Sequence, residues 1–394
     1  MNAKNVEYKK NKQSEALGIY CHVPFCVKKC AYCDFSSFGC QENQTVARYF
    51  NALHREINKF AEQHKEVPLT PVDTIYFGGG TPSSVDPVYI ETTLVLLKEV
   101  FCIADNAEIT IEINPGTLTL EKARRYKKAG INRVSVGLQA WQDFLLKILG
   151  RVHSQSEFID SMEILKTVGF VNFSVDVMYG LPGQKLMDVI ETLTALMTFS
   201  PTHISCYSLI LEADTPMANW VEAGQLDLPD EDEEREMHWA IDRFLKKQGY
   251  DHYEISSYCQ SGYESRHNVK YWELVPYLGF GLGAYGYFNG QRYGNTNKLT
   301  DYCNLIELEK SPGVVEPMMS KEELMSDWMF LGLRKLSGVR DDLFKARFGV
   351  SFFDRYEIAI HALINEGLLE WDGSNLKLTP LGQDFGNRVF AAFV

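Results

Sequence analysis

The sequence predicts an α/β fold with a mostly parallel sheet, followed by a smaller α+β domain. Three observations support this prediction. At 394 residues the chain is too long for one ordinary core, so two or three domains are expected. Short β-rich runs alternate with amphipathic, helix-like segments over the first 250 residues. From about residue 251 this alternation gives way to a Tyr/Gly-rich stretch, then to helical patterns and a short hairpin.

The predicted strands are short runs that contain Val, Ile, Tyr or Phe and end at turn residues. They are residues 17–23, 72–79, 107–113, 133–138, 172–180 and 203–211. Strands that alternate with helices form a mostly parallel sheet, either open or curved into a barrel, and six strands are two short of a closed eight-stranded barrel. Both architectures bind ligands at the carboxyl ends of the strands. We therefore expect the functional residues in the loops that follow these runs.

The predicted helices between the strands are residues 45–64, 87–101, 119–129, 155–168 and 185–199. The acidic stretch 227–237 is expected to open another helix, over residues 233–248, because a proline and carboxylates suit a helix N-terminus.

The predicted domains are a flexible, polar tail (1–16), an α/β core (17–250) and a C-terminal domain (251–394). In the last of these, helical patterns at 320–336, 341–347 and 352–366 precede two short strands around the turn at 372–375, and a final helix follows. Helices followed by a small hairpin resemble a winged-helix unit, for which packing against the core is the expected role.

Composition and charge exclude several classes of protein. With 45% apolar and 23% charged residues, the chain is a soluble globular protein rather than a disordered or fibrous one. Its net charge of −13 makes a nucleic-acid partner unexpected, because an acidic surface repels phosphates. We expect no transmembrane segment, since no apolar run approaches the roughly 18 residues that span a bilayer. A cytoplasmic location is expected, because the N-terminus lacks the apolar segment of a signal peptide.

Five of the nine cysteines lie between Cys21 and Cys40, and three of these have the spacing C-x3-C-x2-C. Thiolates at Cys26, Cys30 and Cys33 suit an iron–sulfur cluster or zinc, and the third alternative is that they are incidental. Zinc needs a fourth ligand, which would be His22, Cys40 or a remote residue. A [4Fe–4S] cluster needs only these three and keeps one iron open. The position after the first strand favours the cluster, and the other six cysteines are expected to be packing residues.

A wider motif surrounds these cysteines, from Tyr20 through Cys33 to Asp34 and Phe35, and it resembles the signature of radical S-adenosylmethionine (SAM) enzymes. Within them the chain resembles the family of oxygen-independent coproporphyrinogen III oxidases and their HemW-type relatives. The resemblance continues along almost the whole chain after residue 17. Its further segments are FGGGTPS (77–83), IEINPG (111–116), RVSVGLQAW (133–141), LGRVHS (149–154), DVMYGLPGQ (176–184), HNVKYW (267–272) and FLGLR (330–334).

The resemblance implies a partial (βα)6 radical SAM barrel with a HemN-type C-terminal domain, and two cofactors. A [4Fe–4S] cluster on Cys26, Cys30 and Cys33 would bind the amino and carboxylate groups of SAM through its open iron. An electron, ultimately from a reductant protein, would cleave the sulfonium to methionine and a 5′-deoxyadenosyl radical. The protein orients the cofactors and excludes water and oxygen. No catalytic side chain is assigned.

The resemblance also implies which residues contact SAM. Read alone, the glycines after the second strand let backbone groups approach a ligand, and carboxylates near strand ends can accept hydrogen bonds from an ammonium or ribose group. The more ordinary interpretation is a strand-ending turn and solvated or paired carboxylates. The family contacts carry over onto Tyr20, Tyr32, Gly79, Gly80, Thr81, Glu112, Gln139, Arg151 and Asp176.

Two functions of different class fit this family. One is an enzyme of porphyrin biosynthesis, a coproporphyrinogen oxidase that oxidatively decarboxylates coproporphyrinogen III to protoporphyrinogen IX. The other is a haem chaperone that carries haem as cargo and transfers it to an acceptor protein. Three features favour the chaperone. Phe35 stands where the oxidase branch has a further cysteine, only about 19 residues precede Tyr20, and residues 267–272 match the H-N-x-x-Y-W motif associated with haem binding.

The H-N-x-x-Y-W motif has a plausible chemistry for haem. A neutral His267 imidazole can ligate haem iron, and Tyr271 and Trp272 can offer flat apolar surface to a porphyrin. The alternative is a hydrogen-bonded His267 with Tyr271 and Trp272 as core anchors. Taken with the other two features, the motif favours haem.

Overall fold

The computed structural model describes residues 16–65 and 70–394. Its centre is an open twelve-stranded sheet in the order β14-β13-β12-β11-β1-β4-β5-β6-β7-β8-β10-β9. The run from β1 to β8 in this order is parallel, as predicted. These strands are β1 (Leu17–Val23), β4 (Val72–Gly79), β5 (Ile103–Ile113), β6 (Arg133–Gln139), β7 (Phe173–Tyr179) and β8 (His203–Ser208). Almost all of the predicted tail lies outside the described residues.

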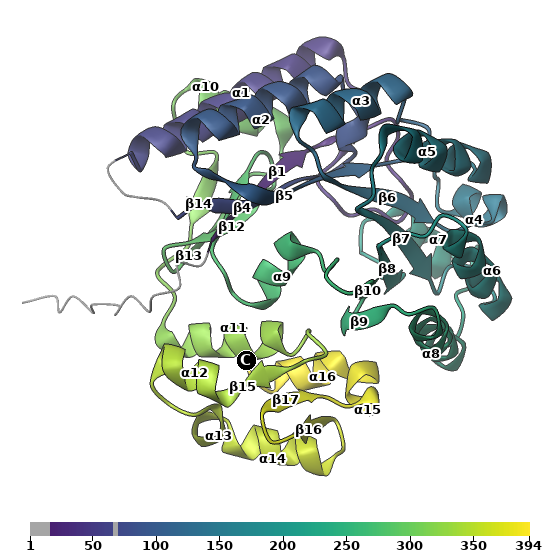
Figure 1. Ribbon diagram of the computed structural model, residues 1–394, viewed down its shortest axis with the longest axis vertical. Coiled ribbons are helices and arrows are strands. Elements are labelled where there is room, and N and C mark those ends of the chain that lie inside the picture. The colour runs from purple at the N-terminus through teal and green to yellow at the C-terminus, as the bar shows by residue number, and fades with distance from the viewer. Residues whose placement is uncertain (1–15, 66–69) are drawn as a thin grey trace, which may run out of the picture.

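Helices cover the convex face of the curved sheet (Figure 1). They are α1 (Asn43–Gln63), α2 (Pro87–Val100), α3 (Leu120–Ala129), α4 (Asp143–Ile148), α5 (Gln155–Val168), α6 (Leu186–Met197), α7 (Pro216–Glu222) and α8 (Glu231–Lys247). Alternate strand residues such as Ile75 and Val136 are fully buried beneath them. The sequence does not predict α4 and α7, because they are too short to show a helical period.

Six further strands that the sequence does not predict extend the sheet at both edges. Antiparallel β10 (Ser257–Cys259) and β9 (Asp251–Glu254) follow β8. Beside β1 lie parallel β11 (Tyr277–Phe280) and then the antiparallel strands β12 (Tyr285–Phe288), β13 (Gln291–Asn295) and β14 (Gly313–Val315). The boundary at residue 250 stays a prediction, since one sheet spans both sides of it.

Tyrosine rings cover glycines in the Tyr/Gly-rich strands, which explains why this stretch forms a sheet. A side chain at Gly286 would lie 2.2 Å from the ring of Tyr293, and one at Gly294 would lie 2.6 Å from the ring of Tyr285. Pairing an aromatic residue with a cross-strand glycine compensates for the missing side chain. Propensity alone disfavours glycine in strands, so these strands are not predicted from the sequence.

Helix α9 (Arg266–Trp272) lies on the concave side of the sheet, between the sheet and the C-terminal domain (Figure 1). This helix carries the H-N-x-x-Y-W motif. Strand residues that point away from the outer helices, such as Thr74 and Tyr76, face it. The concave face of the sheet is therefore filled by a helix that the sequence does not predict.

The C-terminal domain combines helices with a three-stranded sheet in the order β15-β17-β16. Its elements are α11 (Lys321–Gly332), β15 (Val339–Arg340), α12 (Asp341–Phe348), α13 (Phe352–Arg355), α14 (Glu357–Asn365), β16 (Leu369–Trp371), β17 (Asn375–Leu378), α15 (Pro380–Asp384) and α16 (Gly386–Ala391). The predicted hairpin is confirmed and gains β15 as a third strand. Its apolar core, which includes Phe344 and Phe352, is separate from that of the large sheet.

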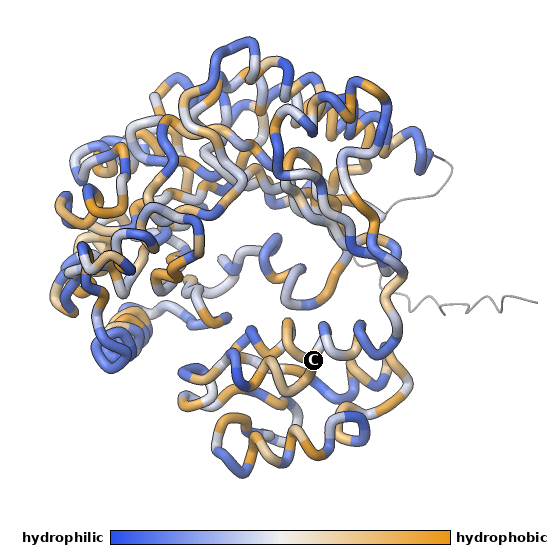
Figure 2. Tube along the Cα trace, turned by 180° about the vertical axis from the view of Figure 1, so that it is seen from behind, coloured by the Kyte–Doolittle hydropathy of each residue, from blue (hydrophilic) through white to orange (hydrophobic). Residues whose placement is uncertain are grey.

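Polar contacts join this domain to the core. The Leu336 N–H donates to the Tyr253 carbonyl at 3.0 Å, and the Ile255 N–H donates to the Arg334 carbonyl at 3.1 Å. From α8, which is amphipathic in Figure 2, the indole of Trp239 donates to Asp384 at 3.0 Å. The domain therefore attaches beside β9 and α9.

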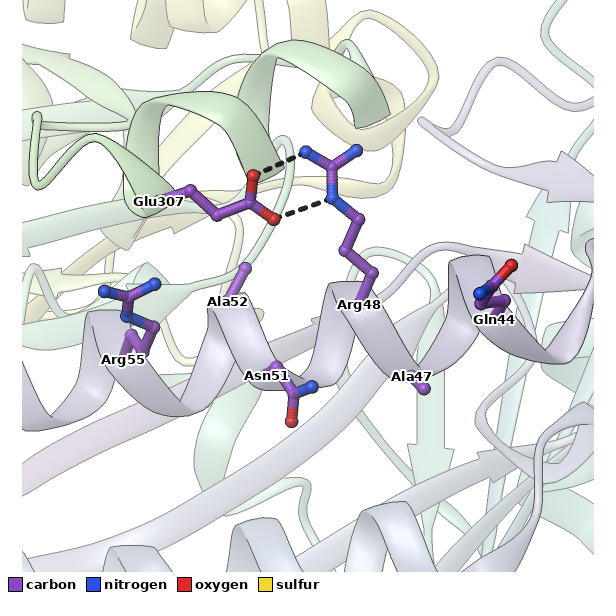
Figure 3. A pocket seen from close by; sticks show the side chains of 7 residues that line it. All are labelled: Gln44, Ala47, Arg48, Asn51, Ala52, Arg55 and Glu307. Atoms are coloured by element: carbon purple, nitrogen blue, oxygen red, sulfur yellow. Dashed lines mark hydrogen bonds and ion pairs between the residues drawn. The ribbon is translucent and has the colours of Figure 1, made fainter.

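Helix α10 (Leu299–Glu307) packs on α1 at the far side of the molecule. Figure 3 shows the guanidinium of Arg48 paired through two nitrogens with the carboxylate of Glu307, at 2.7 Å each. A surface hollow of about 380 Å³ lies beside this pair and contains none of the predicted site residues. Residues 16–65 and 70–394 contain no helix that is both long and apolar enough to cross a membrane.

Candidate active site

The cluster loop, residues 24–41, follows β1 at the carboxyl end of the parallel strands. It is closed by a short parallel pair, β2 (Phe25–Cys26) and β3 (Phe38–Gly39). The Ala31 N–H donates to the Leu149 carbonyl at 2.9 Å, and the Ala31 carbonyl accepts from the Met217 N–H at 3.0 Å. These bonds fasten the loop to segments that follow β6 and β8, so the loop lies over one edge of the sheet.

The three predicted ligands, Cys26, Cys30 and Cys33, are all partly buried thiols. Thr81 Oγ1 donates to the Cys26 sulfur at 3.4 Å, and Arg151 Nη1 donates to the Cys30 sulfur at 3.6 Å. Burial raises the pKa of Cys26 and of Cys33, and a negative charge on Cys30 raises both further. The sulfurs are thus near one another and face donors, which fits a cluster held by three thiolates.

The zinc alternative lacks a ligand set in the part of the chain that is described. His22 is hydrogen-bonded through both ring nitrogens, to the Tyr20 hydroxyl at 3.0 Å and to the Ser36 carbonyl at 2.9 Å. No three His, Cys, Asp or Glu side chains of the described residues gather closely enough to hold one metal ion. In a cubane each thiolate binds a different iron, so its ligands need not converge as zinc ligands do.

Cys40 and Cys102 correct the expectation that the remaining cysteines are packing residues. Both thiols are exposed, whereas Cys21, Cys206 and Cys303 are buried. Cys259 is also buried. Packing therefore accounts for four of the six, and these two side chains contribute little to the core.

Glycines at the end of β4 let three backbone segments meet. Gly79 has a φ of 112°, and a side chain there would come within 2.3 Å of the His22 ring. A side chain at Gly80 would lie 2.8 to 2.9 Å from backbone atoms of Phe25 and Val23. The absence of Cβ atoms is what lets the cluster loop approach the strand ends, as the sequence suggested for a ligand site.

Glu112, near the end of β5, is held by two donors. The Tyr76 hydroxyl donates to Oε1 at 2.8 Å, and the Gly79 N–H donates to Oε2 at 3.0 Å. Burial raises the pKa of Glu112 to about 7; the Tyr76 and Gly79 hydrogen bonds oppose the shift, and the charge of Asp176 adds to it. A carboxylate so placed is suited to a cationic ligand.

Asp176 and Gln139 lie on the neighbouring strands β7 and β6. Ser135 donates to the two oxygens of Asp176 at 3.3 and 3.2 Å, and burial raises the pKa of this carboxyl. Gln139 has a φ of 73°, which is unusual for a residue other than glycine, and its Oε1 accepts from the Tyr207 hydroxyl at 3.1 Å. Positive φ in a buried strand-end residue indicates a constrained site.

Arg151 links the cluster loop to the strand ends. Its Nη2 donates to the Gly137 carbonyl at 2.6 Å and to Asn114 Oδ1 at 2.7 Å, while its Nη1 faces Cys30. Asn114 in turn donates to Thr81 Oγ1 at 2.9 Å. The predicted residues Thr81 and Arg151 are therefore joined through Asn114, which the sequence analysis did not single out.

Tyr20 and Tyr32 lie at opposite sides of this site. The Tyr20 ring stacks on Tyr76, with the ring centres 6.1 Å apart, inside the curved sheet. Tyr32 is in the cluster loop and packs against the small apolar cluster that includes Leu149 and Met217. The two predicted tyrosines thus lie in different parts of the site, Tyr20 on β1 and Tyr32 in the cluster loop.

His267 lies against Tyr76, which also donates to Glu112, and it is only 1% exposed. Its Nδ1 is hydrogen-bonded to Thr74 Oγ1 at 2.8 Å and its Nε2 to the Tyr271 hydroxyl at 2.9 Å. Burial lowers its pKa to about 3, and the charges of Lys270 and Arg133 lower it further. This geometry matches the alternative of a hydrogen-bonded histidine. Trp272, the last motif residue, instead faces the C-terminal domain, where Arg334 lies 4.5 Å from its ring.

Like Asn114, Tyr76 and Arg133 are residues of this site that sequence reasoning missed. Arg133 is 2% exposed, and its Nε has no hydrogen-bond partner among the described residues. Its positive charge lowers the pKa of Glu112 and of Asp176. A charged residue at the start of a buried strand was the available signal, because such a residue is rarely buried without a reason.

Two sequence families match the chain. The Radical SAM superfamily matches residues 20–196, and the HemN C-terminal domain matches residues 319–385. The superfamily match implies a [4Fe–4S] cluster and SAM, in agreement with the thiol loop described above. The second match begins well after residue 251, just before α11.

Curated bacterial proteins called "Heme chaperone HemW" are similar to this chain over nearly its whole length. The Bacillus subtilis protein is 37% identical over 377 residues, which cover 95% of this chain and 98% of that protein. The Lactococcus lactis protein is 37% identical and covers 95% and 96% of the two chains. The Mycobacterium tuberculosis protein is 31% identical, with coverage of 95% and 94%.

Among solved structures, the fold is similar to that of the coproporphyrinogen III oxidase HemN from Escherichia coli, described as a radical SAM enzyme. The TM-score is 0.84, and the match covers 96% of this chain and 90% of that chain. The two sequences are 19% identical. At this identity the match establishes the α/β fold with its C-terminal domain and does not carry an activity.

Proposed function

This chain belongs to the HemW family of radical SAM proteins, and on that basis we propose that it binds haem and transfers it to an acceptor protein. The observation that carries the proposal is the similarity to proteins called heme chaperone along 95% of the chain. Phe35 adds to it, because this position holds a cysteine in the oxidase branch. The Phe35 side chain is 67% exposed, so the residue that stands in place of that cysteine is not part of the core.

The cofactor side of the proposal uses the residues around the cluster loop. Cys26, Cys30 and Cys33 would hold the cluster, which supplies an electron to SAM when both are bound. Glu112 would accept hydrogen bonds from the ammonium group of SAM, and Asp176 from its ribose. The remaining contacts proposed are Tyr20, Tyr32, Gly79, Gly80, Thr81, Gln139 and Arg151. A reductant protein is the proposed source of the electron.

The haem side of the proposal uses α9. We assign His267 as the haem iron ligand and Tyr271 and Trp272 as the flat surface beside the porphyrin. Both ring nitrogens of His267 are hydrogen-bonded in this structure, so ligation requires the bond to Thr74 or the bond to Tyr271 to break. Haem uptake is therefore proposed to accompany a movement of α9.

The alternative is an oxygen-independent coproporphyrinogen III oxidase. The HemN fold favours it, but at 19% identity fold similarity carries no activity. The two functions differ in substrate: the oxidase consumes porphyrinogen, whereas the chaperone takes up finished haem and releases it unchanged.

A paired anaerobic assay tests the proposal. The full chain with its cluster reconstituted is given SAM, a reductant, and either haem or coproporphyrinogen III. We expect stable haem uptake, seen as a Soret band, transfer to an apo-acceptor, and no protoporphyrinogen. Protoporphyrinogen formation would establish the oxidase instead.

Variants separate ligation from folding in this assay. His267→Ala should abolish the Soret shift of bound haem. His203→Ala is the matched control, because His203 is also buried and is bonded to a hydroxyl at 2.7 Å and a tyrosine at 2.9 Å, but lies outside the motif. Equal haem uptake by both variants and the parent protein would refute His267 as ligand.

A further inference from the structure

We propose that Tyr76 is a positioning residue that couples Glu112 to α9, so that haem uptake and SAM binding weaken each other. This inference rests on the proposed function and extends it to regulation. Tyr76 belongs to β4; its hydroxyl donates to Glu112, and its ring stacks on the histidine of the H-N-x-x-Y-W motif. Its role is to transmit a movement, not to react.

The hydroxyl of Tyr76 fixes one carboxylate oxygen of Glu112. Its hydroxyl donates to Glu112 Oε1 at 2.8 Å, while the other oxygen is held by the Gly79 N–H at 3.0 Å. Gly78 has no side chain, and a Cβ there would lie 2.8 Å from the Tyr76 ring and 3.0 Å from both carboxylate oxygens. Because the Gly79 donor belongs to the backbone, Tyr76 is the donor that a side-chain movement can remove.

The ring of Tyr76 contacts the His267 ring. The two rings are stacked, with centres 5.3 Å apart and planes 27° apart, and Tyr20 closes the other side at 6.1 Å. His267 is locked in this stack by Thr74 and Tyr271. The position of the Tyr76 ring therefore depends on whether α9 keeps His267 in this stack.

Haem ligation by His267 would open this arrangement. The imidazole can present a nitrogen to iron only after that nitrogen has left its hydrogen bond to Thr74 or Tyr271, and a ring that moves to do so no longer supports Tyr76. A loosened Tyr76 holds Glu112 less well, so the ammonium group of SAM is bound less tightly. Coupling between two binding equilibria is reciprocal, so SAM weakens haem binding by the same factor. SAM therefore favours the conformation in which His267 keeps its contacts with Thr74, Tyr271 and Tyr76, and haem favours a conformation in which His267 has moved.

A second buried histidine provides an internal control. His203 bridges Ser174 Oγ at 2.7 Å and the Tyr253 hydroxyl at 2.9 Å, in the same way that His267 bridges Thr74 and Tyr271. Tyr253 lies in β9, and its hydroxyl also accepts from the Ser265 N–H at 3.3 Å. It lies at the β9 edge of the sheet, away from β4, and its hydroxyl bonds His203 and Ser265 rather than Glu112.

The test measures SAM affinity in the presence and absence of haem. The full chain carrying its cluster is dialysed anaerobically against labelled SAM, with or without saturating haem, as parent protein, Tyr76→Phe and Tyr253→Phe. In the parent protein we expect haem to weaken SAM binding several-fold. Tyr76→Phe should weaken SAM binding about tenfold without haem and abolish the haem effect, because a hydrogen bond to a charged group is lost. Tyr253→Phe should behave as the parent.

A second variant removes a hydrogen bond of His267 instead of one of Glu112. Thr74→Val removes the bond to His267 Nδ1 and leaves Glu112 and Tyr76 in place, so haem binding should tighten. Cluster absorbance and thermal melting verify that each variant is folded.

The outcomes separate this inference from the proposed function. Haem uptake by the parent protein with no change in SAM affinity overturns the coupling and leaves the chaperone function standing. Unchanged SAM affinity in Tyr76→Phe overturns the positioning role. Absence of haem uptake refutes the chaperone function and with it the coupling, whatever Tyr76→Phe shows for SAM alone.

Discussion

At the scale of single residues, the site depends on buried charge. Burial raises the pKa of Glu112 to about 7, so its carboxyl changes charge near neutral pH. Charged or titratable side chains from five elements face this carboxylate. They are Tyr20 of β1, Tyr76 of β4, Arg133 of β6, Asp176 of β7 and Tyr271 of α9. Arg133 is the cation in this set, which gives it a defined electrostatic role.

Removing that cation should shift the pH dependence of SAM binding. The ammonium group needs ionised Glu112, so SAM affinity should rise with pH through about 7 in the parent protein. In Arg133→Met the midpoint should lie at higher pH, because the lost positive charge no longer lowers the pKa of Glu112 and Asp176. Equilibrium dialysis with SAM between pH 6 and about 9 measures this.

Arg334→Met is the matched control for this prediction. Arg334 also has a buried Nε without a hydrogen-bond partner among the described residues, but it lies against Trp272 in the C-terminal domain. Its removal should leave the midpoint in place. Identical pH profiles for all three proteins would contradict the role given to Arg133.

At the scale of elements, close backbone approach positions the site. The Gly80 N–H donates to the Val23 carbonyl at 2.9 Å, and the Thr81 N–H donates to the Phe25 carbonyl at 2.8 Å. The end of β4 and the start of the cluster loop therefore touch backbone to backbone. A glycine is required where such segments meet, and Gly80 is that residue.

Gly80→Ala should therefore impair cluster assembly. Its methyl group would lie 2.8 to 2.9 Å from three backbone atoms, none of which can turn aside, so the loop must shift away from the strand. Gly39→Ala is the matched control in the same loop, where the nearest atoms would be 3.5 Å or more away. Iron content and brown absorbance after reconstitution measure the effect. A full cluster in Gly80→Ala would show that this contact is dispensable.

At the scale of the whole molecule, several histidines are buried as neutral groups. Burial lowers the pKa of His22 to about 4 and those of His153 and His267 to about 3. The unfolded chain, with histidine pKa values of about 6.5, binds protons between these limits that the folded protein does not, so these groups reduce stability as pH falls from about 7 to about 4. Glu112, whose pKa is raised, acts in the opposite direction.

His153→Gln isolates one of these contributions. Between pH 7 and about pH 5 the parent protein should lose roughly 2 kcal/mol more of its free energy of unfolding than the variant does, because the variant lacks that titrating group. Urea unfolding at the two pH values measures the difference. An equal loss in both proteins would show that His153 is protonated in the folded state.

The arrangement of the domains adds a condition on function. The C-terminal domain lies on the side of α9 away from the sheet, and Trp272 is covered by Arg334 from that domain. Helix α9 is therefore held between the sheet and this domain, so a movement of α9 also involves their contact. The expectation that the C-terminal domain packs against the core as a support agrees with this position.

The sequence by itself determined the parallel sheet, the cluster loop and the family. Periodic apolar runs define β1 and β4 to the residue, and the spacing of Cys26, Cys30 and Cys33 is local, so both can be read along the chain. The strands rich in Tyr and Gly and the short helix α9 could not, because their stability comes from cross-strand rings and from burial rather than from propensity.

Only the tertiary structure decided how the two functional motifs are related. Residues 111–116 and 267–272 are far apart in sequence, and no local pattern joins them. Folding brings Glu112 to the hydroxyl and His267 to the ring of one tyrosine, Tyr76, and buries the histidine that a motif alone would present as a free ligand. Contacts between distant segments depend on strand order and on which face of the sheet is filled, and these are properties of the packed molecule.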